Sequence, residues 1–221
     1  MTQSSQLNID QSILSVAGRL GLVAVGLNVL GIVALKDVTT PYKMGGLDGW
    51  IESMPNYPGA TATSAVAFTF AVLTMIPWAW GIQHRDGRAG VKLGALSITL
   101  GSIMNAVACL VPFVVVTHFL PACADAAACH PTARALLGYA ITMDGLFNAL
   151  LGSGLLAIGL TWLKDDTARK QGILATLAGL GTLPVALQPI SDAAQQLLAV
   201  GGPLWLAFIT WTSIDLLRGR S

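Results

Sequence analysis

Long apolar runs separated by short polar segments dominate the pattern of hydrophobic and polar positions along this chain. Six of the runs reach about 20 residues with few charged side chains, which is the length that an α-helix needs to cross the hydrocarbon core of a bilayer. Each run is expected to be a helix, because a backbone in lipid must satisfy its own hydrogen bonds. The predicted spans are residues 13–35, 62–82, 92–118, 135–163, 172–190 and 196–217.

This pattern predicts an all-α fold: a polytopic membrane protein built as a six-transmembrane-helix bundle, with one transmembrane domain over residues 1–221. Similar residues recur at the span borders, where a basic residue stands two positions before a glycine in Arg19–Gly21, Lys92–Gly94 and Lys170–Gly172. Such a weak repeat would fit three helical hairpins. The other interpretation is that basic residues gather at membrane borders in any multispan protein.

The composition agrees with a membrane protein and narrows the partners. Of the 221 residues, 54% are hydrophobic and 10% are charged, and the mean hydropathy is +0.68. The net charge of +1 leaves no broad basic surface, which excludes nucleic acid as a partner. The lipid bilayer is therefore the first partner that the sequence predicts.

The positions of the basic residues predict the orientation of the spans. With six spans, both termini lie on one side, and of the 12 Lys and Arg only Lys36, Lys43 and Arg134 fall on the other. Because cytoplasmic loops carry the excess of Lys and Arg, the N- and C-termini are predicted to be cytoplasmic. The first residues show no small-residue cleavage site, so no removable signal peptide is expected.

Cys123 and Cys129 lie in the loop between the third and fourth predicted spans, on the side opposite the termini. Cysteines paired at short range belong in an oxidising compartment, so we predict a disulfide between them. Cys109 lies within the third span and is expected to pack among apolar side chains. His118 and His130 are close to the pair in sequence, but no spacing here matches a known ligand pattern. Neither a metal site nor another cofactor is expected.

The longest outer segment, residues 36–60, contains a short amphipathic stretch at residues 47–54. This stretch could form about two turns of helix on the outer leaflet, with Trp50 as the interfacial anchor. It could equally fold over the mouth of the bundle. The sequence leaves both alternatives open.

Polar side chains gather in the outer halves of the predicted spans. Asp144 lies about 12 Å deep in the fourth span at 1.5 Å per residue, and Asn148 is one turn deeper on the same face. A carboxyl group within a bilayer is costly and marks a functional site by default, although an interhelical hydrogen bond that only fixes packing is the alternative. The predicted ligand-binding residues are Asn28, Asn105, Asp144, Asn148, Gln188 and Asp192.

The fourth and fifth spans carry residues that shape helix packing. In the fourth, small residues recur every four positions from Gly145 to Ala157, which favours close approach of another helix. In the fifth, Pro184 and Pro189 could break the helix around a binding site, as in transporters. Proline and glycine are also common in ordinary membrane helices.

No catalytic residues are predicted, and the chain is not expected to be an enzyme. Ser153 stands between two glycines, as in intramembrane serine proteases, but His84, His118 and His130 all lie at span ends or in loops while Ser153 is deep. That placement argues against a nucleophile with its base. It also leaves no buried histidine for haem.

The layout resembles the small six-span bacterial integral membrane proteins of unknown function, in length, span count and a fourth-span aspartate followed by a glycine-rich run. The resemblance implies a bacterial inner-membrane location and supplies no activity. From the residues we expect an outward-facing polar pocket that binds a small-molecule or lipid-like, amphipathic ligand, as a transporter or sensor. The alternative is a non-catalytic accessory or scaffold subunit of a homo-oligomer or larger membrane complex, assembled through the small-residue faces.

Overall fold

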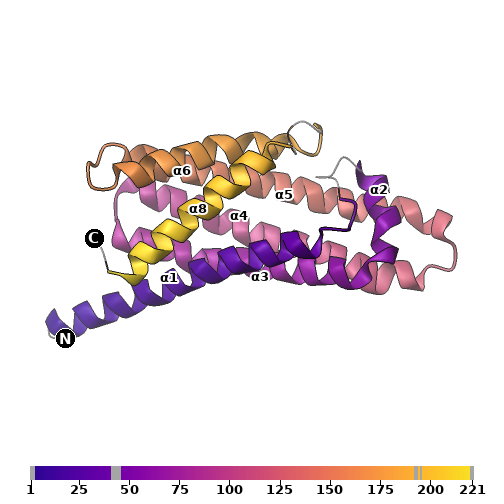
Figure 1. Ribbon diagram of the computed structural model, residues 1–221, viewed down its shortest axis with the longest axis horizontal. Coiled ribbons are helices and arrows are strands. Elements are labelled where there is room, and N and C mark those ends of the chain that lie inside the picture. Colours follow the sequence, from indigo (N-terminus) through magenta and orange to yellow (C-terminus); the bar gives the residue numbers. More distant parts are fainter. Residues whose placement is uncertain (1–2, 41–45, 192–193, 195, 220–221) are drawn as a thin grey trace.

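The computed structural model describes residues 3–40, 46–191, 194 and 196–219, and this part of the chain is helical, without strands (Figure 1). Five of its helices are long and apolar enough to cross a membrane, which indicates an integral membrane protein. They are α1 (Gln3–Ala34), α3 (Pro58–Arg85), α4 (Ala89–Val114), α5 (Ala126–Trp162) and α8 (Leu198–Leu217).

The predicted fifth span, residues 172–190, has a different structure. Its α-helix, α6, covers Arg169–Thr182, which is 14 residues, and continues as the 3-10 turn η5, Leu183–Leu187. Pro184 lies in that turn; a proline lacks the backbone N–H that an α-helical hydrogen bond needs, and its ring crowds the preceding turn. Five of the six predicted spans are therefore long helices, and the fifth is a shorter helix with an irregular end.

The five long helices and α6 pack in chain order. Each contacts the next one along the chain, and α8 contacts both α6 and α1. In Figure 1, α8 lies near α1 at the end of the bundle that carries the termini, and diverges toward α6 at the opposite end. Because every pair of consecutive helices in this series is adjacent, the packing does not distinguish three hairpins from a continuous series, and the predicted repeat stays a prediction.

Glycines permit the closest approaches between α5 and its neighbours. A Cβ atom on Gly152 would lie 2.8 Å from the Leu183 backbone nitrogen, and one on Gly154 would lie 2.8 Å from the Gly94 carbonyl oxygen of α4. On Gly145 it would lie 3.0 Å from a carbonyl oxygen of η5. The glycines of α5 are therefore used for packing within the chain.

Charged residues tie the turns together at the end that carries the termini. Arg88 donates to Asp86, with 2.9 Å between Nε and Oδ1, and its guanidinium lies 3.2 Å from Asp165 in the α5–α6 connection. Trp162 Nε1 also donates to Asp86, at 2.7 Å. Burial opposes ionisation of Asp86, but the hydrogen bonds from Arg88 and Trp162 outweigh it and hold the pKa of this carboxyl below its usual value. The α3–α4 and α5–α6 turns are fixed to each other in this way.

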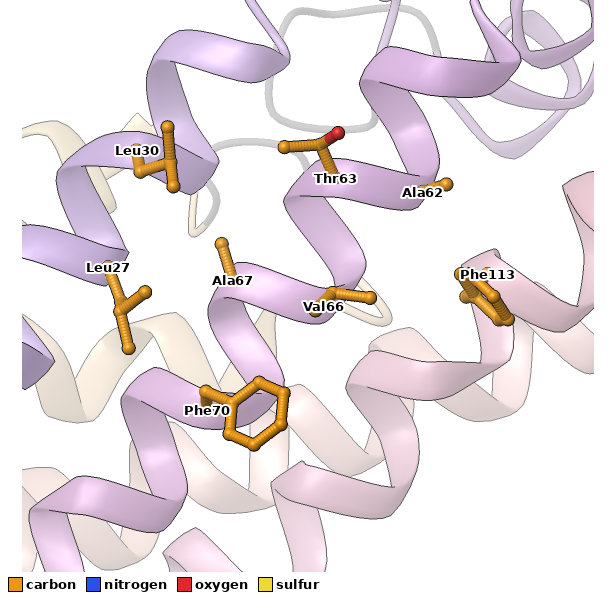
Figure 2. A pocket seen from close by; sticks show the side chains of 8 residues that line it. All are labelled: Leu27, Leu30, Ala62, Thr63, Val66, Ala67, Phe70 and Phe113. Carbon is orange, nitrogen blue, oxygen red and sulfur yellow. The ribbon is translucent and has the colours of Figure 1, made fainter.

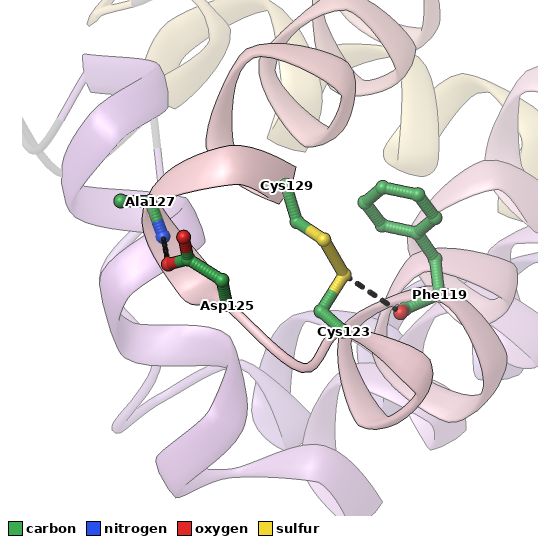
Figure 3. The surroundings of a disulfide bond; sticks show 5 residues. All are labelled: Phe119, Cys123, Asp125, Ala127 and Cys129. Carbon is green, nitrogen blue, oxygen red and sulfur yellow. Dashed lines mark hydrogen bonds between the residues drawn. A yellow bond between two sulfur atoms is a disulfide. The ribbon is translucent and has the colours of Figure 1, made fainter.

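The opposite end carries a short helix and a disulfide. The helix is α2 (Gly46–Ser53), followed by the 3-10 turn η2, Met54–Asn56. Cys123 and Cys129 are bonded, with 6.2 Å between their Cα atoms, which confirms the predicted pair (Figure 3). The bond joins the residue after the 3-10 turn η4, Leu120–Ala122, to the first turn of α5, where Asp125 accepts from the Ala127 N–H as an N-cap.

Candidate functional site

A cavity of about 510 Å³ lies inside the bundle at the α2 end. Its lining comes from α1, α2, α3, α4, α5 and α8 and from the segments beside them, and most of it is apolar. Four aromatic side chains from different helices contribute to these walls: Trp50, Phe68, Phe147 and Trp205. Such a combination of concave apolar walls and few polar groups is typical of small-molecule sites.

Asp144 forms the centre of the polar wall of this cavity. Asn105 Nδ2 of α4 donates to its Oδ1 at 3.1 Å, and Asn148 Nδ2, one turn further along α5, donates to its Oδ2 at 3.2 Å. Gln188 Nε2, which follows η5, donates to the same Oδ2 at 2.7 Å. Three amides thus surround one half-buried carboxylate, and they do so from three separate elements.

The structure brings most of the predicted ligand-binding residues together. Asn28, Asn105, Asp144 and Asn148 line the cavity, whereas Gln188 is not among its lining residues and contacts Asp144 by the hydrogen bond described above. Asp192 lies outside the described residues. The prediction thus identified a real cluster, and its role in ligand binding stays a prediction.

Three lining residues carry a buried polar atom with no hydrogen-bond partner in the described part of the chain. These atoms are Trp50 Nε1, Thr61 Oγ1 and Asn105 Oδ1, on side chains that are 8%, 1% and 3% exposed. A buried polar atom without a partner costs free energy, so most such atoms in proteins are paired. These lining residues thus carry hydrogen-bonding capacity that the described part of the chain does not use.

Polar contacts with α5 hold α2 over the cavity. Asp48 of α2 accepts from Arg134 Nη1 at 2.7 Å and lies 3.6 Å from His130 Nε2, both on α5. Ser53 Oγ also donates to the Thr39 carbonyl at 3.0 Å. Trp50 is consequently buried against the cavity. Of the two alternatives that the sequence left open, the structure has the one in which this stretch folds over the bundle.

The cavity reaches the outside of the chain between α1 and α8. Ile32 of α1 lines it and is 57% exposed, and Ala199 and Pro203 of α8 line it and are also exposed. This is the side where α8 diverges from α1 in Figure 1. A molecule in the cavity would therefore meet the surface of the bundle between these two helices.

A second hollow, of about 360 Å³, lies between α1, α3 and α4 (Figure 2). Leu27 and Leu30 line it from α1, and Phe113 lines it from α4. Thr63 of α3 is the polar side chain of a lining that is otherwise apolar. This hollow lacks the charged and amide groups of the first cavity, so we do not consider it the candidate site.

The described residues contain no group of three or more His, Cys, Asp or Glu side chains arranged to hold a metal ion. Comparisons of the chain with models of protein families, with curated proteins and with solved structures found no match.

Proposed function

We propose that this chain is an integral membrane protein that binds a small or amphipathic molecule in the cavity around Asp144, as a transporter or a sensor. The observation that carries the proposal is a cavity of about 510 Å³ that combines apolar walls with a carboxylate held by three amides. That volume lies in the range of pockets for drug-sized ligands. Ionisable groups at membrane depth are rare and mark ligand or ion sites by default.

An amphipathic ligand fits the position of the cavity. The exposed lining residues are Ile32 on α1 and Gln196, Ala199 and Pro203 in or beside α8, and three of these four are apolar. Both helices are apolar enough to lie in a bilayer, so a molecule dissolved there could enter with its apolar part first and reach the residues around Asp144. Such a route would not require α2 to move.

In the proposed topology the chain crosses the membrane six times, with both termini in the cytoplasm and α2 outside. At 1.5 Å per α-helical residue and about 2 Å per 3-10 residue, α6 and η5 together would extend about 31 Å. This length matches the hydrocarbon core of about 30 Å, so a sixth crossing is geometrically feasible. The excess of Lys and Arg at the end with the termini supports the orientation.

The scaffold alternative has less support. It depends on small-residue faces of α5 that would receive another protein, but Gly145, Gly152 and Gly154 contact other parts of this chain. We therefore prefer the ligand-binding proposal, which a substitution within the cavity can test.

Gly202→Phe is expected to abolish retention of the ligand. Gly202 lines the cavity, and a Cβ atom added there would meet nothing within 4 Å, so the new ring would occupy the cavity without a clash. We expect native mass spectrometry of protein purified in a mild detergent to show a bound small molecule on the parent chain and none on this variant. Gly26→Phe is the matched control, because Gly26 is exposed on α1, has equally open surroundings and is not in the cavity lining. Equal retention by all three proteins would contradict the proposal.

A pair of glycine-to-cysteine variants is expected to confirm the orientation. Gly59, in the first turn of α3, and Gly87, between α3 and α4, are exposed at opposite ends of the bundle, and an added Cβ meets no atom closer than 3.9 Å at either. In intact cells a membrane-impermeant maleimide should label Gly59→Cys, and should label Gly87→Cys only after permeabilisation. The parent chain serves as the control for its own cysteines. Labelling of Gly87→Cys in intact cells would reverse the proposed orientation.

A further inference from the structure

We propose that the ligand of this cavity is an organic cation, meaning a protonated or quaternary amine with apolar substituents. The inference rests on the proposed function, because it assigns a chemical class to the ligand of the same site. The charge and the aromatic side chains of the lining both favour such a ligand.

The lining of the cavity has an acidic residue and no basic one. Among the lining residues in the described part of the chain, Asp144 is the acidic residue, and Lys, Arg and His are absent. The amides of Asn105 and Asn148 stabilise the carboxylate by hydrogen bonds but contribute no net charge. In a space walled by apolar side chains, charge is poorly screened, so a ligand cation is attracted and a ligand anion is repelled.

Two basic residues that contact α2 are engaged with its carboxylate. Arg134 and His130 both contact Asp48, and neither belongs to the cavity lining. They therefore do not offer a counter-charge for a carboxylate or phosphate group inside the cavity. This arrangement disfavours a fatty acid or an anionic lipid headgroup as the occupant.

The aromatic side chains of the lining can contact both the charged group and the apolar substituents of an organic cation. Trp50, Phe68, Phe147 and Trp205 line the cavity from four helices, and aromatic rings attract ammonium groups as well as burying apolar substituents. Among the described residues, Asn105 Oδ1 has no hydrogen-bond partner, and it belongs to the amide that donates to the Asp144 carboxylate. An amine N–H beside the carboxylate would be a donor of the kind that this oxygen lacks.

The test compares two ions of nearly the same shape and opposite charge, together with a smaller neutral probe. Purified protein in nanodiscs of phosphatidylcholine would be titrated with tetraphenylphosphonium, with tetraphenylborate and with neutral triphenylphosphine, and binding measured by calorimetry against empty nanodiscs. We expect the cation to bind at least tenfold more tightly than the anion. Asp144→Asn should weaken cation binding at least tenfold and leave binding of the neutral probe within twofold.

Two further variants separate charge from folding. Asp144→Glu retains the charge and should retain the preference for the cation. Asp10→Asn removes a carboxylate that lies 3.0 Å from His84, at the opposite end of the bundle, and should change none of the affinities.

The outcomes distinguish the inference from the function on which it rests. Equal binding of cation and anion, tighter binding of the anion, or an unchanged preference in Asp144→Asn would overturn the cation assignment and leave a ligand-binding cavity standing. Absence of binding by all three probes, in protein that elutes as a single species and unfolds cooperatively, would contradict both.

Discussion

Gly172→Val is expected to destabilise the folded bundle by about 3 kcal/mol or more, because it forces apart the α5–α6 hairpin. Gly172 is buried in the first turns of α6, and a Cβ atom there would lie 2.7 Å from the Leu163 nitrogen and 2.8 Å from the Trp162 carbonyl carbon. Both are backbone atoms, so no change of rotamer relieves the overlap. Valine adds two methyl groups beyond that Cβ, which places the cost at the upper end of the range for overpacked cores.

Titration with sodium dodecyl sulphate, followed by circular dichroism, would measure this loss. Gly26→Val is the matched control, because Gly26 also lies in a helix but is exposed and has no atom within 4 Å of an added Cβ. The control should unfold within about 1 kcal/mol of the parent chain. If the two variants unfolded alike, the close contact between α5 and α6 would not contribute to stability.

The long helices and the polar cluster could be predicted from the sequence, because both depend on interactions between residues that are close together in the chain. A run of apolar residues as long as Pro58–Arg85 has few alternatives to a membrane helix. The cost of a carboxylate in lipid required Asp144 to face protein, and the spacing of four residues placed Asn148 beside it. The pair Cys123 and Cys129 followed from short separation and a common loop.

Other features depend on packing between distant segments, which the sequence pattern does not determine. The run at 172–190 was as apolar as a span should be, but its prolines divide it into α6 and a 3-10 turn. Trp50 suits a helix on the membrane surface as well as a helix folded over the bundle, because its side chain is amphipathic. It is buried in a helix that the contact between Asp48 and Arg134 holds in place, and these two residues are 86 positions apart in sequence.

The partnerless atoms could not be predicted for the same reason. Thr61 stands directly before the predicted span 62–82, where a threonine is an ordinary border residue. Its hydroxyl is seen to be buried only when α3 is packed against its neighbours beside the cavity. For Gln188 the sequence predicted too much. Its polarity and depth predicted a residue of the cavity wall, whereas in the fold its amide donates to the Asp144 carboxylate.

Asp144→Leu is expected to reduce the free energy of unfolding by about 2–4 kcal/mol, as three amides lose their shared acceptor. Hydrogen bonds between membrane helices average about 0.6 kcal/mol and reach about 1.7 kcal/mol. The bonds from Asn105 and Gln188, which reach Asp144 from other elements, would be lost together with the side-chain bond from Asn148 within α5. Leucine also leaves the polar amides beside an apolar group, which adds a desolvation cost. Asp144→Asn keeps the shape and one acceptor oxygen, so its loss should be smaller. Detergent titration of both variants against the parent chain would measure the difference.

A double-mutant cycle assigns part of this loss to a named contact. Asn105→Leu removes one of the three donors, and its effect combined with Asp144→Leu should fall short of the sum by about 0.6–1.7 kcal/mol, the range for a direct membrane hydrogen bond. Asn28→Leu is the control, because Asn28 is a buried lining residue whose amide donates to the Ala24 carbonyl of its own helix, at 2.9 Å. Its effect should add to that of Asp144→Leu within about 0.5 kcal/mol. Simple additivity in both cycles would mean that Asp144 contributes no hydrogen-bond energy to α4 packing, and the carboxylate would then have to be explained by the ligand alone.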